Sequence, residues 1–146
     1  MRTRLTMIVP LLLTLAAACG GGQASSPVSS ADCQATASHK VGSTLAVDVD
    51  PADSSIRGLL LQGATATAGK PFSVRWVVDA RKAGREMRMR AIRQGTNQVI
   101  DLTWSGTTSG QLAEFPARIT FPAPGCWSAD LSSGTAGGEV VLRVDA

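Results

Sequence analysis

The sequence predicts an all-β fold, an antiparallel β-sandwich of about seven or eight strands. Three observations support this prediction. Short segments alternate between apolar and polar residues, as expected for strands with one buried and one solvated face. Residues typical of turns separate these segments. No window shows a strong helical periodicity.

The alternating segments follow one another through most of the chain. The clear cases are Leu45–Val49, Phe72–Val78, Met87–Ala91, Ile100–Trp104 and Val140–Val144, and the shorter ones are Ile119–Phe121 and Trp127–Leu131. Ile56–Gln62 is more uniformly apolar, which fits either a central strand or an edge strand covered by the N-terminal segment. Arg81–Arg90 has room for a few helical turns, but the alternation favours a strand from Glu86 onward.

The N-terminus has the features of an export signal. Arg2 and Arg4 precede an apolar stretch, Leu5–Ala18, which is shorter than the roughly 20 residues of a membrane-spanning helix. The stretch ends in three alanines directly before Cys19, an order that resembles the bacterial lipobox. We therefore expect a signal peptide at 1–18 and lipidation of Cys19. The alternative is a plain signal peptide with a cysteine at its cleavage site.

Lipidation of Cys19 would place the protein outside the cytoplasm, anchored through its N-terminal lipid to the bacterial cell membrane, or to the outer membrane where there is one. The Gly/Ser-rich segment 19–31 predicts a flexible tether, and residues 32–146 then form the sandwich domain. Removal of Arg2 and Arg4 leaves 14 − 2 = 12 basic residues against 11 acidic ones. This near-neutral balance gives no reason to expect a nucleic-acid partner.

The segment Phe121-Pro-Ala-Pro-Gly-Cys-Trp127 carries a resemblance to a known group. Together with the lipobox and the final strands, Ile119–Val144, it resembles uncharacterised bacterial exported lipoproteins with an immunoglobulin-like sandwich. The resemblance implies an immunoglobulin-like fold and says almost nothing about activity. Independently, alternation places Cys126 and Trp127 on opposite faces of a strand. The bulky Trp127 is expected to face inward unless Cys126 is bridged.

Three cysteines are present, Cys19, Cys33 and Cys126. With Cys19 acylated, an even pair remains in an oxidising compartment, and we expect a disulfide between Cys33 and Cys126. The alternative is two free thiols. The spacing contains no Cys-x-x-Cys motif, so we expect no metal or redox role for these residues.

Half of the twelve basic residues of the mature chain fall within thirteen positions, and only Glu86 opposes them. On the outer face of a strand they would form a basic stripe able to hold an anionic polymer, lipid headgroups or an acidic protein. The alternative is a solubilising strand face that prevents aggregation. The residues are Arg81, Lys82, Arg85, Arg88, Arg90 and Arg93.

Other candidate sites have simpler interpretations. Asp48, Asp50 and Asp53 surround Pro51 but lack the remainder of a calcium loop, so a polar turn is preferred. His39 is the single histidine, in what reads as an exposed loop, and no Gly-x-Ser-x-Gly sequence supports a hydrolase. The three tryptophans are expected in the core: Trp76, Trp104 and Trp127.

The sequence thus predicts a non-enzymatic binding or structural module of the cell envelope, with no cofactor and no metal. The first alternative is a module that binds anionic ligands or polyanions through Arg81–Arg93. A second and weaker alternative is an envelope hydrolase.

Overall fold

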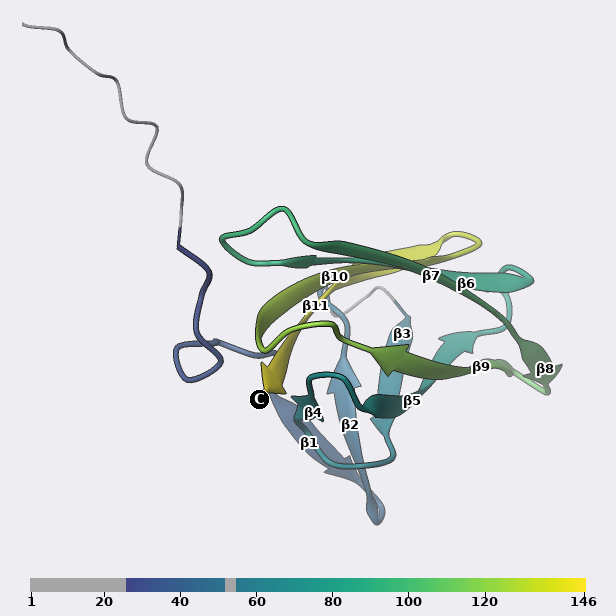
Figure 1. Ribbon diagram of the computed structural model, residues 1–146. Coiled ribbons are helices and arrows are strands. Elements are labelled where there is room, and N and C mark those ends of the chain that lie inside the picture. Colours follow the sequence, from purple (N-terminus) through teal and green to yellow (C-terminus); the bar gives the residue numbers. More distant parts are fainter. Residues whose placement is uncertain (1–25, 52–54) are drawn as a thin grey trace, which may run out of the picture.

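The computed structural model describes residues 26–51 and 55–146, which form an all-β sandwich with eleven strands (Figure 1). The first sheet has the order β1-β2-β3-β5-β9-β8 and the second has the order β4-β11-β10-β6-β7. The strands are β1 (Ser38–Val41), β2 (Thr44–Asp48), β3 (Ile56–Leu60), β4 (Ala66–Thr67), β5 (Pro71–Asp79), β6 (Glu86–Arg93), β7 (Val99–Ser105), β8 (Thr107–Ser109), β9 (Leu112–Thr120), β10 (Gly125–Ser133) and β11 (Ala136–Asp145). The predicted all-β sandwich is confirmed.

The core lies between the two sheets and is built by the predicted alternation. In β5 every second side chain is buried, from Phe72 to Val78, and Trp76 lies at its centre with no exposed surface. Gly58 of β3 lies directly opposite Trp76. A Cβ atom at Gly58 would lie 2.6 Å from Trp76 Cζ3, so the tryptophan ring occupies the space that a side chain at this position would need.

The second sheet contributes the facing half of the core. Met87, Met89 and Ala91 of β6 are buried, and β10 buries Trp127 while Cys126 points to the outer face. Trp127 Nε1 donates a hydrogen bond to the Ala123 carbonyl at 3.1 Å, which satisfies its polar atom inside the core. The predicted strand from Glu86 and the inward orientation of Trp127 are both confirmed.

The strand order bears on the subtype of the sandwich. The orders β3-β5-β9-β8 and β11-β10-β6-β7 follow the A-B-E-D and G-F-C-C′ orders of immunoglobulin sandwiches. The hairpin of β1 and β2 extends the first sheet beyond this pattern, so β3 is a central strand rather than a covered edge. The immunoglobulin-like subtype stays a prediction, and this strand order favours it.

The strand count exceeds the predicted seven or eight because several strands escape the sequence pattern. β4 and β8 have two and three residues, and β1 is a short, fully exposed edge strand where we expected a loop. β9 is long but contains Pro116, a residue that argues against a strand. β8 pairs only with Leu112–Glu114 of β9. At Pro116, β9 therefore has a single neighbour among the described strands, β5, and its other side is open.

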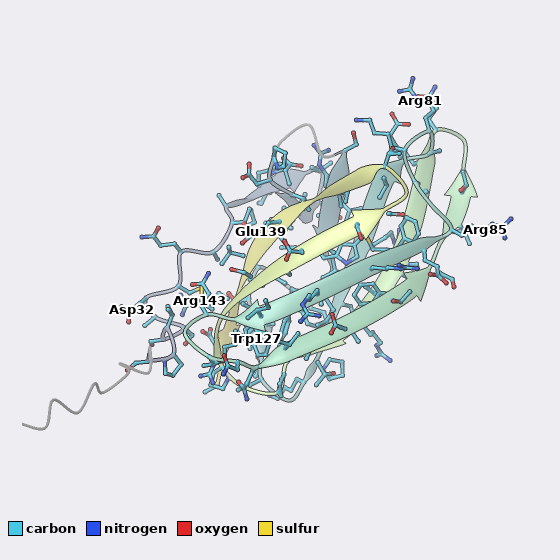
Figure 2. All side chains as sticks on the ribbon, turned by 90° about the horizontal axis from the view of Figure 1, so that it is seen from above. Asp32, Arg81, Arg85, Trp127, Glu139 and Arg143 are labelled. Carbon is cyan, nitrogen blue, oxygen red and sulfur yellow. A yellow bond between two sulfur atoms is a disulfide. The ribbon has the colours of Figure 1, made fainter. Side chains whose placement is uncertain are left out.

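An N-terminal segment crosses the outer face of the second sheet before the chain enters β1. Val28 N donates to the Gln94 carbonyl at 3.2 Å, and Thr36 N donates to the Val141 carbonyl at 2.9 Å. Residues 26–31, which belong to the predicted tether, thus include a backbone contact with the β6–β7 turn. The Ser26 carbonyl lies against Gly95 of this turn. Figure 2 shows Asp32 of the same segment at one end of the domain and Arg81 and Arg85 at the opposite end.

Candidate functional site

The six basic residues occupy three separate places. Arg81, Lys82 and Arg85 belong to the loop between β5 and β6, Arg88 and Arg90 lie on the outer face of β6, and Arg93 ends that strand. The structure therefore divides the predicted stripe between one end of the sandwich, the outer face and the opposite end.

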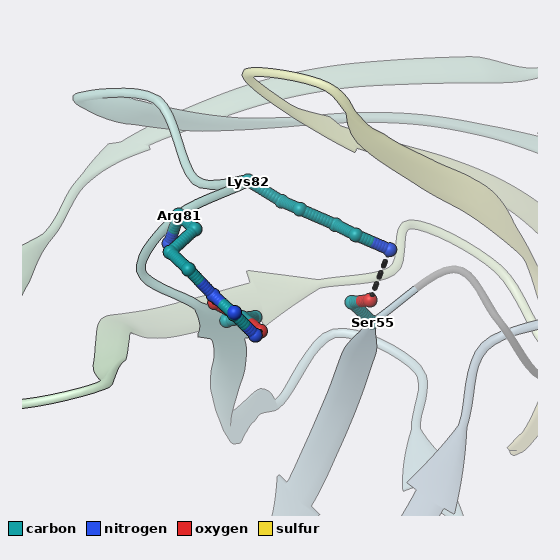
Figure 3. A network of polar contacts seen from close by, with 4 residues as sticks. Ser55, Arg81 and Lys82 are labelled. Atoms are coloured by element: carbon teal, nitrogen blue, oxygen red, sulfur yellow. Dashed lines mark hydrogen bonds and ion pairs between the residues drawn. The ribbon is translucent and has the colours of Figure 1, made fainter.

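Arg81 is held by the acidic residue that precedes it. Its Nη2 and Nε lie 2.7 and 3.1 Å from the Asp79 carboxylate, and its backbone N donates to the same carboxylate at 3.0 Å. Hydrogen bonds from the Arg81 side chain and backbone lower the pKa of Asp79 to about 2. The same contact raises the pKa of Arg81. Lys82 extends in another direction, and its Nζ donates to Ser55 Oγ at 2.8 Å (Figure 3).

Carboxylates also accompany both arginines on the outer face of β6. Arg90 Nη1 donates to the two Asp101 oxygens at 3.1 and 3.2 Å, and Arg88 Nη2 lies 3.5 Å from Glu86. The neighbour of Arg90 on its other side is Asp130 of β10. This face, which is turned toward the viewer in Figure 2, is an arrangement of alternating charges rather than a continuous positive stripe.

The Arg93 side chain packs against the domain rather than extending into solvent. Its Nη1 donates to Gln98 Oε1 at 3.1 Å, and its Nε is buried without a hydrogen-bond partner among the described residues. Gly125, at φ 135°, leaves the room that Arg93 occupies, because a Cβ there would lie 2.9 Å from the Arg93 Nε atom. Arg93 therefore contributes to the packing of the end at which the N-terminal segment crosses.

Arg85 differs from the other five. It is exposed, and within residues 26–51 and 55–146 its guanidinium group makes no ion pair or hydrogen bond. Two hollows flank it, one of about 400 Å³ bounded by Ser132–Gly134 and one of about 600 Å³ bounded by Ser105 and Thr108. Of the predicted basic set, Arg85 is the residue whose charge is most available to an anion.

Sequence reasoning missed the acidic partners of this set. Asp79 is only two residues from Arg81, so its proximity was available from the sequence. Asp101 is eleven residues from Arg90, and only the register of β6 and β7 brings the two together. The predicted stripe was overestimated because that register could not be read from the pattern.

The predicted disulfide is present and lies on the outer face of the second sheet. Cys33 and Cys126 are joined by an S–S bond of 2.03 Å across 93 positions of sequence. Cys126 is buried, and Cys33 is half-buried in the N-terminal segment. The bond fastens this segment beside β11, where Thr36 Oγ1 also accepts a hydrogen bond from Val141 N at 2.8 Å. The predicted signal peptide 1–18 and Cys19 lie outside the described residues.

The remaining candidates resemble ordinary surface or core features. His39 Nε2 lies 3.7 Å from Asp48, whose other oxygen accepts a hydrogen bond from Arg57 Nε at 2.6 Å. Asp50 bonds through its backbone to Glu139, and Asp53 lies outside the described residues. Among the residues described, the acidic, histidine and cysteine side chains form no group of three that could hold a metal ion.

Of the three tryptophans predicted in the core, Trp76 and Trp127 are fully buried. Trp104 packs against the core but is only half-buried, because β7 is the edge strand of its sheet.

We compared the chain with protein-family models, with curated proteins and with solved structures, and none of them matches it. Within the described residues no helix is long and apolar enough to cross a bilayer.

Proposed function

We propose that this protein is an extracytoplasmic lipoprotein of the cell envelope that acts as a non-enzymatic binding or structural module. The observation that carries the proposal is the Cys33–Cys126 disulfide. Disulfides form and persist in oxidising compartments and are uncommon in reduced cytoplasm. The bond therefore supports the export that the sequence of residues 1–19 predicts.

The placement of the N-terminal segment also supports the proposal. The disulfide and the Val28–Gln94 bond fasten this segment to the sandwich, so a pull on the N-terminus acts on the second sheet rather than on a single fraying strand. Two or three acyl chains at Cys19 would hold the mature chain firmly, because each buried CH₂ contributes about 0.8 kcal/mol. Such a domain can bear load or hold a partner near the membrane.

Intact-mass measurement of the full chain, expressed in a bacterium and extracted from its membranes, tests the proposal. We expect a mass that lacks residues 1–18, carries acyl chains, and is 2 Da below the fully reduced form for one disulfide. The matched variant Cys19→Ser should lose the acyl mass and leave the membrane fraction while it keeps the disulfide. A native product that retains its first eighteen residues and has two reactive thiols would refute the proposal.

The second candidate is a module that binds an anionic polymer through the basic segment. The observation in its favour is Arg85, an exposed guanidinium without an acidic partner among the described residues, beside Arg88 and two hollows. This charge is free to attract an anion, whereas Arg81 and Arg90 are already compensated. The binding would be electrostatic and would weaken with salt.

Retention on a heparin matrix at low salt tests this second candidate. We expect Arg85→Glu to elute at a lower salt concentration than the parent, and Arg88→Glu in addition to lower it further. Arg75→Glu is the matched control, because Arg75 is an exposed arginine on the first sheet, 3.7 Å from Glu114. Equal elution of the Arg85 and Arg75 variants, or no retention of the parent, would dismiss the anion-binding candidate.

A further inference from the structure

Strand β7 is an open edge of the second sheet. It pairs with β6 along its whole length, from Val99 opposite Ile92 to Ser105 opposite Glu86. None of the other described strands pairs with its second edge. Alternate residues of this seven-residue strand direct their backbone N–H and C=O groups away from β6, where a further strand could satisfy them. The strand contains neither Pro nor Lys, the residues that commonly protect an open edge.

The inner face of β7 is apolar but incompletely covered. Ile100, Leu102 and Trp104 point toward the core, yet all three are only half-buried, while the inner residues of β6 beside them are fully buried. An additional strand would cover this apolar row and pair with the open backbone in one step.

The pattern of β7 is symmetric about Leu102, which is its middle residue. An antiparallel pairing of two β7 strands centred there aligns all seven residues and places Leu102 opposite itself. Ile100 then faces Trp104 of the second copy, so the apolar row continues across the contact. Asp101 faces Thr103 of the second copy, whereas a pairing centred on Asp101 would place two like charges directly opposite each other.

Charge on the outer face also favours this register. Arg88 lies beside Thr103 in the register of β6 and β7, its side chain is 72% exposed, and its distance to Glu86 is 3.5 Å. In the proposed pairing, one row across the joined sheets starts at Asp101 of the first copy. It continues through Thr103 of the second copy to the Arg88 beside it. Asp101 would then lie between its own Arg90 and the Arg88 of the second copy, which complements its charge.

We propose that β7 is a self-association edge, through which two copies of this chain join their second sheets in an antiparallel pairing centred on Leu102. The proposal goes beyond the proposed function and does not depend on the lipid anchor. A second copy is the occupant that the symmetry and charges of the strand fit.

Cysteine cross-linking in the full chain tests this pairing. Two differently tagged copies, one with Asp101→Cys and one with Thr103→Cys, are co-expressed, as is Leu102→Cys alone, and each is exposed to mild oxidation. Directly opposite residues in an antiparallel pair alternate between Cα separations of about 4.5 and 5.5 Å, so one of the two designs meets the closer spacing. Both positions of the mixed design are exposed, so folding should be retained.

We expect a cross-linked dimer from the mixed Asp101→Cys and Thr103→Cys copies or from Leu102→Cys. We expect none from Asp101→Cys or Thr103→Cys alone, and none from the parent, which sets the background of its own three cysteines. Adding Leu102→Asp to the mixed pair should abolish the cross-link, while Leu61→Asp, at a leucine 52% exposed and away from β7, should not.

Three results would overturn the proposal. The first is the absence of a cross-link in both designs while the thermal unfolding midpoint matches that of the parent. The second is an equal cross-link from Asp101→Cys alone, which would indicate a different register. The third is a cross-link to an unrelated protein in place of the second copy.

Discussion

Removing the Cys33–Cys126 bond should cause a large loss of stability in this domain. The bond closes a loop of 93 positions, nearly the whole sandwich. Closing a loop of that length removes conformational entropy from the unfolded chain, and the chain-entropy model gives about 4–5 kcal/mol at 25 °C. For a domain of roughly 115 residues this corresponds to a fall in Tm of about 15–20 °C. We expect this loss in the double variant Cys33→Ser/Cys126→Ser.

The assay is urea unfolding followed by tryptophan fluorescence, because Trp76 and Trp127 are fully buried and report the loss of the core. A matched control separates loop closure from local detachment of the N-terminal segment. Thr36→Val removes the hydroxyl that accepts from Val141 N and loosens the same segment while the loop stays closed. We expect this control to lose about 1–3 kcal/mol, the cost of leaving that N–H without its partner.

The comparison between the two variants tests whether the disulfide stabilises the domain by constraining the unfolded chain. If the double serine variant loses less than about 1 kcal/mol, or no more than Thr36→Val, then the bond does not act on the unfolded chain as argued. The slope of the urea dependence checks that both variants still unfold from a native state of similar compactness.

Three further predictions concern single positions. Gly58→Ala should lower the free energy of unfolding by about 1–3 kcal/mol in the same urea assay, since the added methyl group overlaps Trp76, and unchanged stability would contradict the packing described. Ser133→Ala should cost about 1–3 kcal/mol in thermal unfolding, because the buried hydroxyl joins two backbone groups at 3.1 and 2.8 Å, and a neutral result would show that other groups replace it. An NMR titration should give the Asp79 carboxyl a pKa of about 2, and in Arg81→Ala this pKa should return toward 3.8. The contact with Arg81 therefore stabilises the fold fully above the ordinary pKa of Asp79, and this stabilisation is lost as the pH falls toward 2.

The core of the sandwich could be predicted from the sequence because its strands alternate regularly. Phe72–Val78 and Met87–Ala91 show every second residue apolar, and these residues are the buried ones. The Cys33–Cys126 bond followed from the small number of cysteines. β9 was not predicted because it contains Pro116, and a proline argues against a strand unless that strand lacks a neighbour on one side. The missing neighbour at Pro116 follows from the strand topology, which the composition does not reveal.

The charged surface was predicted less well, for a physical reason. Sequence proximity grouped Arg81–Arg93 as one basic segment, but a strand carries its residues about 3.3 Å apart and spreads them along the domain. Asp101 then approaches Arg90 from a different strand. Charge compensation across strands depends on register, and the alternation of apolar residues does not determine which charged residues face one another.

The attachment of the N-terminal segment to the sandwich sets how the protein can stand on a surface. Ser26 follows Cys19 by only seven positions in the sequence, and seven chain steps reach at most about 25 Å. The Ser26 carbonyl lies beside Gly95 of the β6–β7 turn, and the proposed antiparallel β7 pair would point the two copies in opposite directions. Two acylated copies joined in this way would reach a single bilayer with their strands running along the plane of the lipid, so the pair would rest on its side as a low, flat platform.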